Sequence, residues 1–105
     1  MTPGECITVM MDRIVQDCHP LKIILFGSHA RGEAGPESDI DLLVVLPEVV
    51  DKRQAAVTLR RLLTDLPVPK DIVVTTPEEI ARRGDLVGTV LRPALREGKV
   101  LYERS

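Results

Sequence analysis

Two acidic side chains, Asp39 and Asp41, stand one residue apart at the head of an otherwise apolar run. Residues i and i+2 of a β-strand point to the same side, so the two carboxylates project together. Two like charges about 5 Å apart repel by roughly 3 kcal/mol at an effective dielectric constant near 20. A divalent cation removes this repulsion, and Mg²⁺ is commonly bound through one or two carboxylates. The spacing therefore predicts that Asp39 and Asp41 bind magnesium; the plainer alternative is that they cap a turn as solvated groups.

A third carboxylate, Asp71, begins another apolar run, Ile72 to Val74. If the strands that follow Asp41 and Asp71 pair, all three carboxylates meet at one end of the sheet. Three acids can hold two metal ions about 3.5 to 4 Å apart, one activating the attacking oxygen and one holding a triphosphate. Asp71 is therefore predicted as a third metal ligand, or as the base for an attacking hydroxyl. An acid that merely starts a strand is the alternative here.

The segment from Gly27 to Gly32 has the composition of a phosphate-binding loop. Glycine lets a phosphate approach the backbone, and amides at a helix start attract anions. Ser28 adds a hydroxyl donor and Arg31 a guanidinium that suits phosphate oxygens. The residue order fits neither a P-loop nor a dinucleotide-binding loop. We therefore expect Gly27, Ser28 and Arg31 to bind a nucleotide in a different arrangement, with a surface salt bridge as the alternative for Arg31 and an exposed position for His29.

The elements that must position these residues follow from apolar periodicity. Helical spacing predicts helices over 3–18, 55–66, from 77 to a stop at Gly84, and 86–95, with a kink or early stop at Pro93. Short apolar runs predict strands over 21–26, 39–46, 71–75 and 99–102, the last at an edge. This order predicts an α/β (α+β) fold, in which helices flank one small β-sheet, and residues 1–105 are interpreted as a single domain.

Net charge, cysteine content and the length of apolar runs indicate where the protein is located and which partners it can bind. A net charge of −2 argues against broad capture of nucleic acid, although a local loop and a metal can still hold a nucleotide. Cys6 and Cys18 are expected as buried free thiols of a reducing compartment. No apolar run approaches the roughly 18 residues of a transmembrane helix, and no signal peptide is evident. These features predict a cytoplasmic protein without membrane association, and they leave homo-oligomerisation open.

The combination of Gly27-Ser28, ten further residues and Asp39-x-Asp41 resembles the signature of the DNA polymerase β-type nucleotidyltransferase superfamily. The fuller pattern, Gly-Ser-x-Ala-Arg-Gly and then Ser-Asp-Ile-Asp-Leu-Leu-Val, is similar to the minimal nucleotidyltransferases, and the similarity spans nearly the whole chain. The resemblance implies a palm-like mixed sheet with Asp39, Asp41 and Asp71 as ligands of one or two Mg²⁺ ions. It also implies that Gly27 and Ser28 contact the phosphates of ATP or another nucleoside triphosphate.

The same resemblance suggests a partner. Minimal nucleotidyltransferases are often encoded beside an all-helical HEPN-domain protein, as the antitoxin of a toxin–antitoxin pair. We therefore expect transfer of a nucleoside monophosphate, AMP above all, to a hydroxyl, in particular a tyrosine of the HEPN toxin. The alternative is a non-catalytic antitoxin that neutralises its partner by binding. A third class, nucleotidyltransferases that modify antibiotics, usually needs an added substrate domain, for which 105 residues leave little room.

Overall fold

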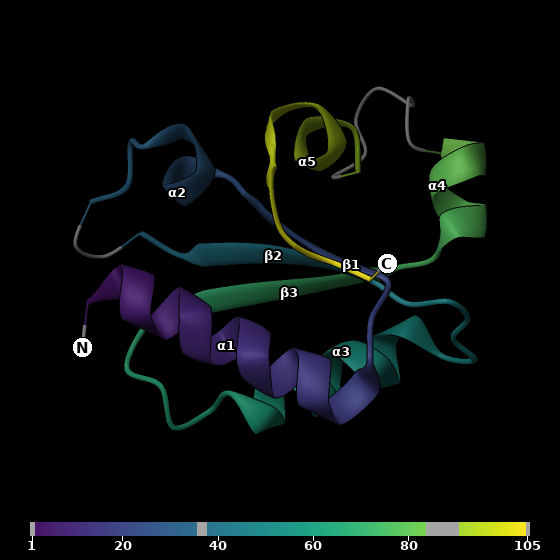
Figure 1. Cartoon of the computed structure of the whole chain (residues 1–105), viewed down its shortest axis with the longest axis horizontal. Coiled ribbons are helices and arrows are strands. Elements are labelled where there is room, and N and C mark those ends of the chain that lie inside the picture. Colours follow the sequence, from purple (N-terminus) through teal and green to yellow (C-terminus); the bar gives the residue numbers. More distant parts are fainter. Residues whose placement is uncertain (1, 36–37, 84–90, 105) are drawn as a thin grey trace.

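The structure is a computed structural model that describes residues 2–35, 38–83 and 91–104. Its elements follow the predicted order, with a short helix, α2, added after the first strand (Figure 1). In chain order they are α1 (Pro3–Cys18), β1 (Lys22–Phe26), α2 (Ser28–Arg31), β2 (Ile40–Val45), α3 (Lys52–Leu62), β3 (Lys70–Thr75), α4 (Pro77–Arg83), α5 (Leu91–Glu97) and β4 (Lys99–Glu103).

Within the described ranges, the strands form one sheet in the order β3-β2-β1-β4. β1 pairs antiparallel with both β2 and β4, whereas β2 and β3 run parallel. The predicted mixed sheet flanked by helices is thus confirmed, and β4 lies at the edge as expected.

The central strand β2 is buried on both faces. Ile40, Leu42 and Val44 belong to the core formed with α1 and α3, while Leu43 belongs to a smaller core with α5. In Figure 1, α1 and α3 lie on one side of the sheet and α2 and α5 on the other. Because side chains alternate along a strand, a slip of one residue would exchange the two faces and turn Asp41 toward the α1–α3 core. The position of Asp41 among the buried residues therefore fixes the register of β2.

Helix α1 spans the residues 3–18 predicted from the sequence. The hydroxyl of Thr2 accepts a hydrogen bond from the Glu5 backbone N–H at 3.1 Å, and the Glu5 carboxylate accepts one from the Thr2 N–H at 3.4 Å. This reciprocal cap satisfies two N–H groups that would otherwise lack partners. Met10 and Ile14 are fully buried, and His19 ends the helix in the left-handed conformation, with φ of 47°.

Helix α3 (Lys52–Leu62) both begins and ends earlier than the helix predicted over 55–66. α3 ends at Leu62, and the chain continues in tight turns in which the Leu63 N–H bonds to the Arg60 carbonyl three residues back. Leu63 and Leu66 remain buried, so their apolar spacing reflects packing rather than a continuous helix. The last predicted helix corresponds to α5, whose described part runs from Leu91 to Glu97, so the helix does not stop early at Pro93. The expected stop at Gly84 and residues 86–90 lie outside the described residues.

The two cysteines match the prediction only in part. Both are free thiols, but Cys6 is buried whereas Cys18 is half-buried. Across the described ranges, no helix combines the length and the apolar character needed to cross a bilayer.

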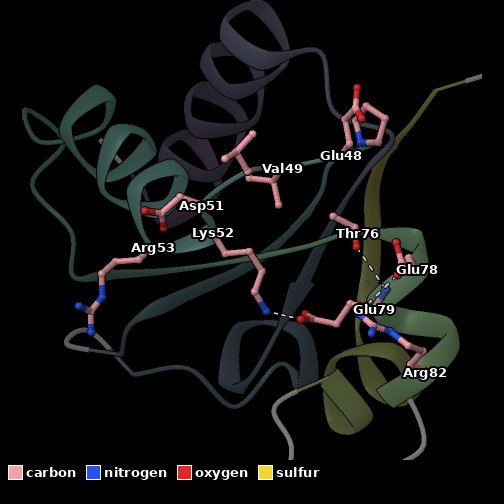
Figure 2. Close-up of a pocket in the computed structure, with 11 residues that line it drawn as sticks. Glu48, Val49, Asp51, Lys52, Arg53, Thr76, Glu78, Glu79 and Arg82 are labelled. Carbon is pink, nitrogen blue, oxygen red and sulfur yellow. Dashed lines mark hydrogen bonds and ion pairs between the residues drawn. The ribbon is translucent and has the colours of Figure 1, made fainter.

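Helix α4 is attached to the rest of the fold by Glu79. Its carboxylate accepts a hydrogen bond from the Thr75 hydroxyl at 2.7 Å and forms an ion pair with Lys52 of α3, toward which it points in Figure 2. Burial raises the pKa of the Glu79 carboxyl, but the hydrogen bonds from Lys52 and Thr75, together with the charges of Lys52 and Arg83, lower it by more, so the pKa lies below its ordinary value of 4.5. Such a carboxylate stabilises the fold above its unfolded-state pKa, and this contribution is lost as the pH falls through the folded-state pKa.

Replacing Glu79 by Gln should therefore lower the free energy of unfolding by about 1 to 2 kcal/mol at pH 7, because hydrogen bonds to a charged group are lost. Urea unfolding measures this, with Glu78→Gln as the control. Glu78 is exposed and lies 3.7 Å from Arg82, so its replacement should cost less than about 0.5 kcal/mol. The difference between wild type and Glu79→Gln should shrink at pH 3; a difference that persists there contradicts the assignment.

Candidate functional site

The site is organised around Gly27 and Asp41. Strand β1 ends at Phe26, which lies opposite Asp41 in the antiparallel register. The next residue, Gly27, has φ of 74° and ψ of −156°, a conformation that side-chain-bearing residues rarely adopt. A Cβ placed on Gly27 would lie 2.2 Å from Asp41 Oδ2. The carboxylate of Asp41 therefore lies directly against backbone that has to be glycine.

Helix α2 carries the rest of the predicted phosphate loop. Ser28 opens this four-residue helix, and Ala30 anchors it by burial against the sheet. The Gly27 carbonyl accepts hydrogen bonds from the N–H groups of Ala30 and Arg31 at 3.1 and 3.2 Å. Gly32 closes the helix in the left-handed conformation. The glycines at both ends thus let one short turn connect β1 to the following loop.

Two side chains of α2 engage that loop. The His29 ring nitrogen Nε2 lies 3.3 Å from the Ser38 carbonyl oxygen, and the ring is half-buried rather than exposed as expected. Arg31 Nε donates to the Glu33 carboxylate at 3.0 Å, and both side chains are exposed. The structure thus places Arg31 in the surface salt bridge that was its alternative interpretation; the predicted phosphate contact stays a prediction.

Asp39 and Asp41 flank the fully buried Ile40. Asp39 is exposed at the entrance to β2, and Asp41 is half-buried as the second residue of the strand. The Ile40 N–H donates to the Pro69 carbonyl at 2.9 Å, which fixes the start of β2 beside the approach to β3. The buried Ile40 therefore keeps both carboxylates at the rim of the sheet.

Asp71 lies in register with Asp41. The two residues are direct partners in the parallel pairing of β2 and β3, so the predicted strand pairing is confirmed. The Asp71 carboxylate, however, accepts a hydrogen bond from Arg60 at 3.0 Å. Arg60 is the residue that the sequence analysis missed. No motif in the sequence indicates a role for Arg60. Its side chain is directed toward β3 because the neighbouring Leu59 and Leu63 pack into the core.

Burial and the nearby carboxylates of Asp39 and Asp71 change the pKa of Asp41. Burial raises the pKa of the Asp41 carboxyl above its ordinary value of 3.8, and the charges of Asp71 and Asp39 raise it further, while His29 and Arg31 oppose them. A raised folded-state pKa means that the ionised carboxylate disfavours the fold at neutral pH. A cation bound at Asp41 would remove this cost.

The donor set fits Mg²⁺ through two carboxylates. Asp39 and Asp41 offer hard oxygen ligands, and the Asp41 carboxylate occupies the space beside Gly27 that a Cβ would need. Within the described ranges, no three His, Cys, Asp or Glu side chains converge closely enough to hold one ion. Magnesium bound by two carboxylates commonly takes its other oxygens from water and phosphates. The geometry thus suits an ion shared with a nucleotide.

A hollow of about 700 Å³ lies at the opposite end of the parallel strands, between the start of α3 and α4 (Figure 2). It is lined by side chains of both charges, including Lys52, Arg53, Glu78 and Glu79. Asp39, Asp41 and Gly27 do not line it. Two ion pairs, Lys52–Glu79 and Arg82–Glu78, join lining residues of this hollow to one another.

Comparison with known proteins points to one family. A model described as "Nucleotidyltransferase domain" matches residues 11–99. The chain is 38% identical over 81 residues to a Methanocaldococcus jannaschii protein named "Putative protein adenylyltransferase", an alignment that covers 77% of each chain. A crystal structure of a "putative nucleotidyltransferase" from Sulfolobus solfataricus superposes with a TM-score of 0.66 at 18% identity, over 95% of this chain and 79% of that one. A variant of the toxin–antitoxin MntA-HpeT gives 0.60 at 26% identity, over 100% and 75%.

The close approach of Gly27 to Asp41 yields a stability test. Gly27→Ala should lower the free energy of unfolding by about 1 to 3 kcal/mol for a backbone conformation that is essentially restricted to glycine, with φ of 74° and ψ of −156°, and by about 1 to 3 kcal/mol more for the collision with the carboxylate. Gly32→Ala is the control for a positive φ without a collision, since Gly32 has φ of 72° and ψ of 19°, in the left-handed region, with nothing within 4 Å of the added Cβ. Urea unfolding compares the two variants. Equal losses would contradict the contact with Asp41.

Proposed function

The chain belongs to the nucleotidyltransferase domain family, and on that premise we propose that residues 1–105 act as one domain that transfers AMP from ATP to a hydroxyl group of a partner protein. The observation that carries the proposal is the contact between the Asp41 carboxylate and the Gly27 backbone. It brings a half-buried, electrostatically strained acid to the loop that contains Ser28. A magnesium ion at Asp41 would therefore lie beside the groups proposed to hold phosphate.

Each residue of the site has a proposed part. Asp39 and Asp41 hold Mg²⁺, which when bound neutralises charge on the triphosphate and helps polarise its α-phosphate. Gly27 presents its backbone to the phosphates and Ser28 its hydroxyl, while Arg31 would have to leave Glu33 to reach them. Asp71 completes the site as the third carboxylate. The exposed Arg31–Glu33 pair is worth little, so its exchange for a phosphate costs little.

The reaction itself is a substitution at phosphorus. The oxygen of the acceptor hydroxyl forms a bond to the α-phosphorus of ATP, and the bond from that phosphorus to the bridging oxygen of pyrophosphate breaks. The hydroxyl proton passes to a base, and pyrophosphate leaves with the electron pair. The domain contributes by positioning both reactants and stabilising charge, which is the larger part of catalysis in phosphoryl-type transfers.

The proposed acceptor is a tyrosine of a HEPN-domain toxin. Two features support a protein acceptor: the relative from Methanocaldococcus jannaschii carries the name "Putative protein adenylyltransferase", and a structural neighbour at 26% identity is part of a toxin–antitoxin assembly. The HEPN partner itself follows from the resemblance to minimal nucleotidyltransferases. The chain would thus act as an antitoxin by modifying its toxin.

Neutralisation without turnover is the second candidate. The engagement of Asp71 by Arg60 favours it, because the three carboxylates do not converge on one ion in this conformation. A domain in that state would bind its partner and mask it, and nucleotide transfer would be dispensable.

One experiment separates the two candidates. The protein is incubated with Mg²⁺, ATP labelled at the α-phosphate and the product of the neighbouring gene, which the proposal expects to be the HEPN-domain toxin. Wild type should label the toxin, and Asp39→Ala/Asp41→Ala should lower the rate by at least about 100-fold, because the metal ligands are lost. Glu48→Ala, an exposed acid at the far end of the sheet, should retain activity.

Neutralisation of the toxin is measured in the same variants. If Asp39→Ala/Asp41→Ala neutralises the toxin as well as wild type does, the catalytic role fails and the binding role is supported. Absence of label on the toxin with wild-type protein, under conditions in which the complex forms, likewise contradicts the proposed transfer.

A further inference from the structure

The third carboxylate of the site is engaged by an arginine. Asp71 stands directly opposite Asp41 in the parallel register, and its charge contributes to the raised pKa of the Asp41 carboxyl. Yet one Asp71 oxygen lies 3.0 Å from the Arg60 guanidinium, and the side chains of Arg60 and Asp71 are about half exposed, at 51% and 49%. Asp71 therefore lies beside the metal-binding pair while hydrogen-bonded to a competing cation.

The fold gives Arg60 this position. Its neighbour Leu59, and Leu63 just beyond the end of α3, are buried in the core on one face of the sheet. β3 is the edge strand beside β2, so no further strand of the described sheet separates α3 from the outer side of Asp71. The long arginine side chain can thus reach around the sheet edge to a carboxylate on the opposite face from its own helix.

We propose that Arg60 is a positioning residue that holds Asp71 in the metal-free protein and releases it when a divalent cation binds at Asp39 and Asp41. This inference rests on the proposed function, because it assumes the metal site. A half-exposed ion pair is weak, so a doubly charged ion that takes carboxylate oxygens can displace the guanidinium. Arg60 would then set how tightly the cation binds, and the exchange would bring the third carboxylate into the site.

Removal of Arg60 should consequently tighten cation binding. Titration with Mn²⁺, followed by the electron paramagnetic resonance signal of the free ion, measures affinity without any reaction. Arg60→Gln should bind Mn²⁺ about two- to fivefold more tightly than wild type, the range expected for loss of a weak competing pair. Arg61→Gln is the matched control, since it removes the same charge from the next residue, which is also exposed. Its affinity should stay closer to that of wild type.

A double-mutant comparison tests whether Arg60 acts through Asp71. In an Asp71→Asn background, Arg60→Gln should give no gain in Mn²⁺ affinity. A gain that persists there, or an equal gain in Arg61→Gln, shows a general effect of charge and overturns the inference while leaving the proposed function intact. If wild type binds no Mn²⁺, or Asp41→Asn binds it equally well, the metal site fails and both proposals fall.

Discussion

The proposed site depends on the antiparallel pairing that sets the end of β1 against the start of β2. In this register Phe26 lies opposite Asp41. Gly27, the first residue after β1, must therefore pass close to the Asp41 carboxylate. A backbone without a Cβ allows that approach, and the positive φ of Gly27 then turns the chain away into α2. One glycine thus brings together a half-buried acid, a serine and a loop rich in polar groups.

The hydrophobic core serves this contact by making the register unambiguous. Leu42 and Leu43 are both fully buried, one toward α1 and α3 and the other toward α5. A strand that is apolar on both faces could exchange them by a slip of one residue, but in β2 such a slip would bury Asp41 in the core. The half-buried Asp41, set between apolar neighbours, therefore fixes the register of the strand. The cost is repulsion among Asp39, Asp41 and Asp71, which the protein tolerates at the sheet rim.

Local signals in the sequence were sufficient to predict most elements, because their apolar periodicity and end signals act over a few residues. The helix predicted over 3–18, observed as Pro3–Cys18, and the strand predicted over 39–46, observed as Ile40–Val45, are examples. Features that depend on contacts between residues far apart in the sequence could not be predicted in the same way. Leu63 and Leu66 continue a helical spacing although α3 has ended, because burial alone preserves it. The contact of Arg60 with Asp71 joins a helix on one face to an edge strand, and no local pattern encodes it.

The central claim is that the carboxylates beside Gly27 form a nucleotide-bound metal site. A crystal structure grown with Mg²⁺ and a non-hydrolysable ATP analogue tests it most directly. The account predicts a magnesium ion about 2.1 Å from carboxylate oxygens of Asp39 and Asp41, with the phosphates over Gly27 and Ser28. A nucleotide bound instead in the hollow between α3 and α4, or bound near Gly27 with no metal at Asp41, would contradict it.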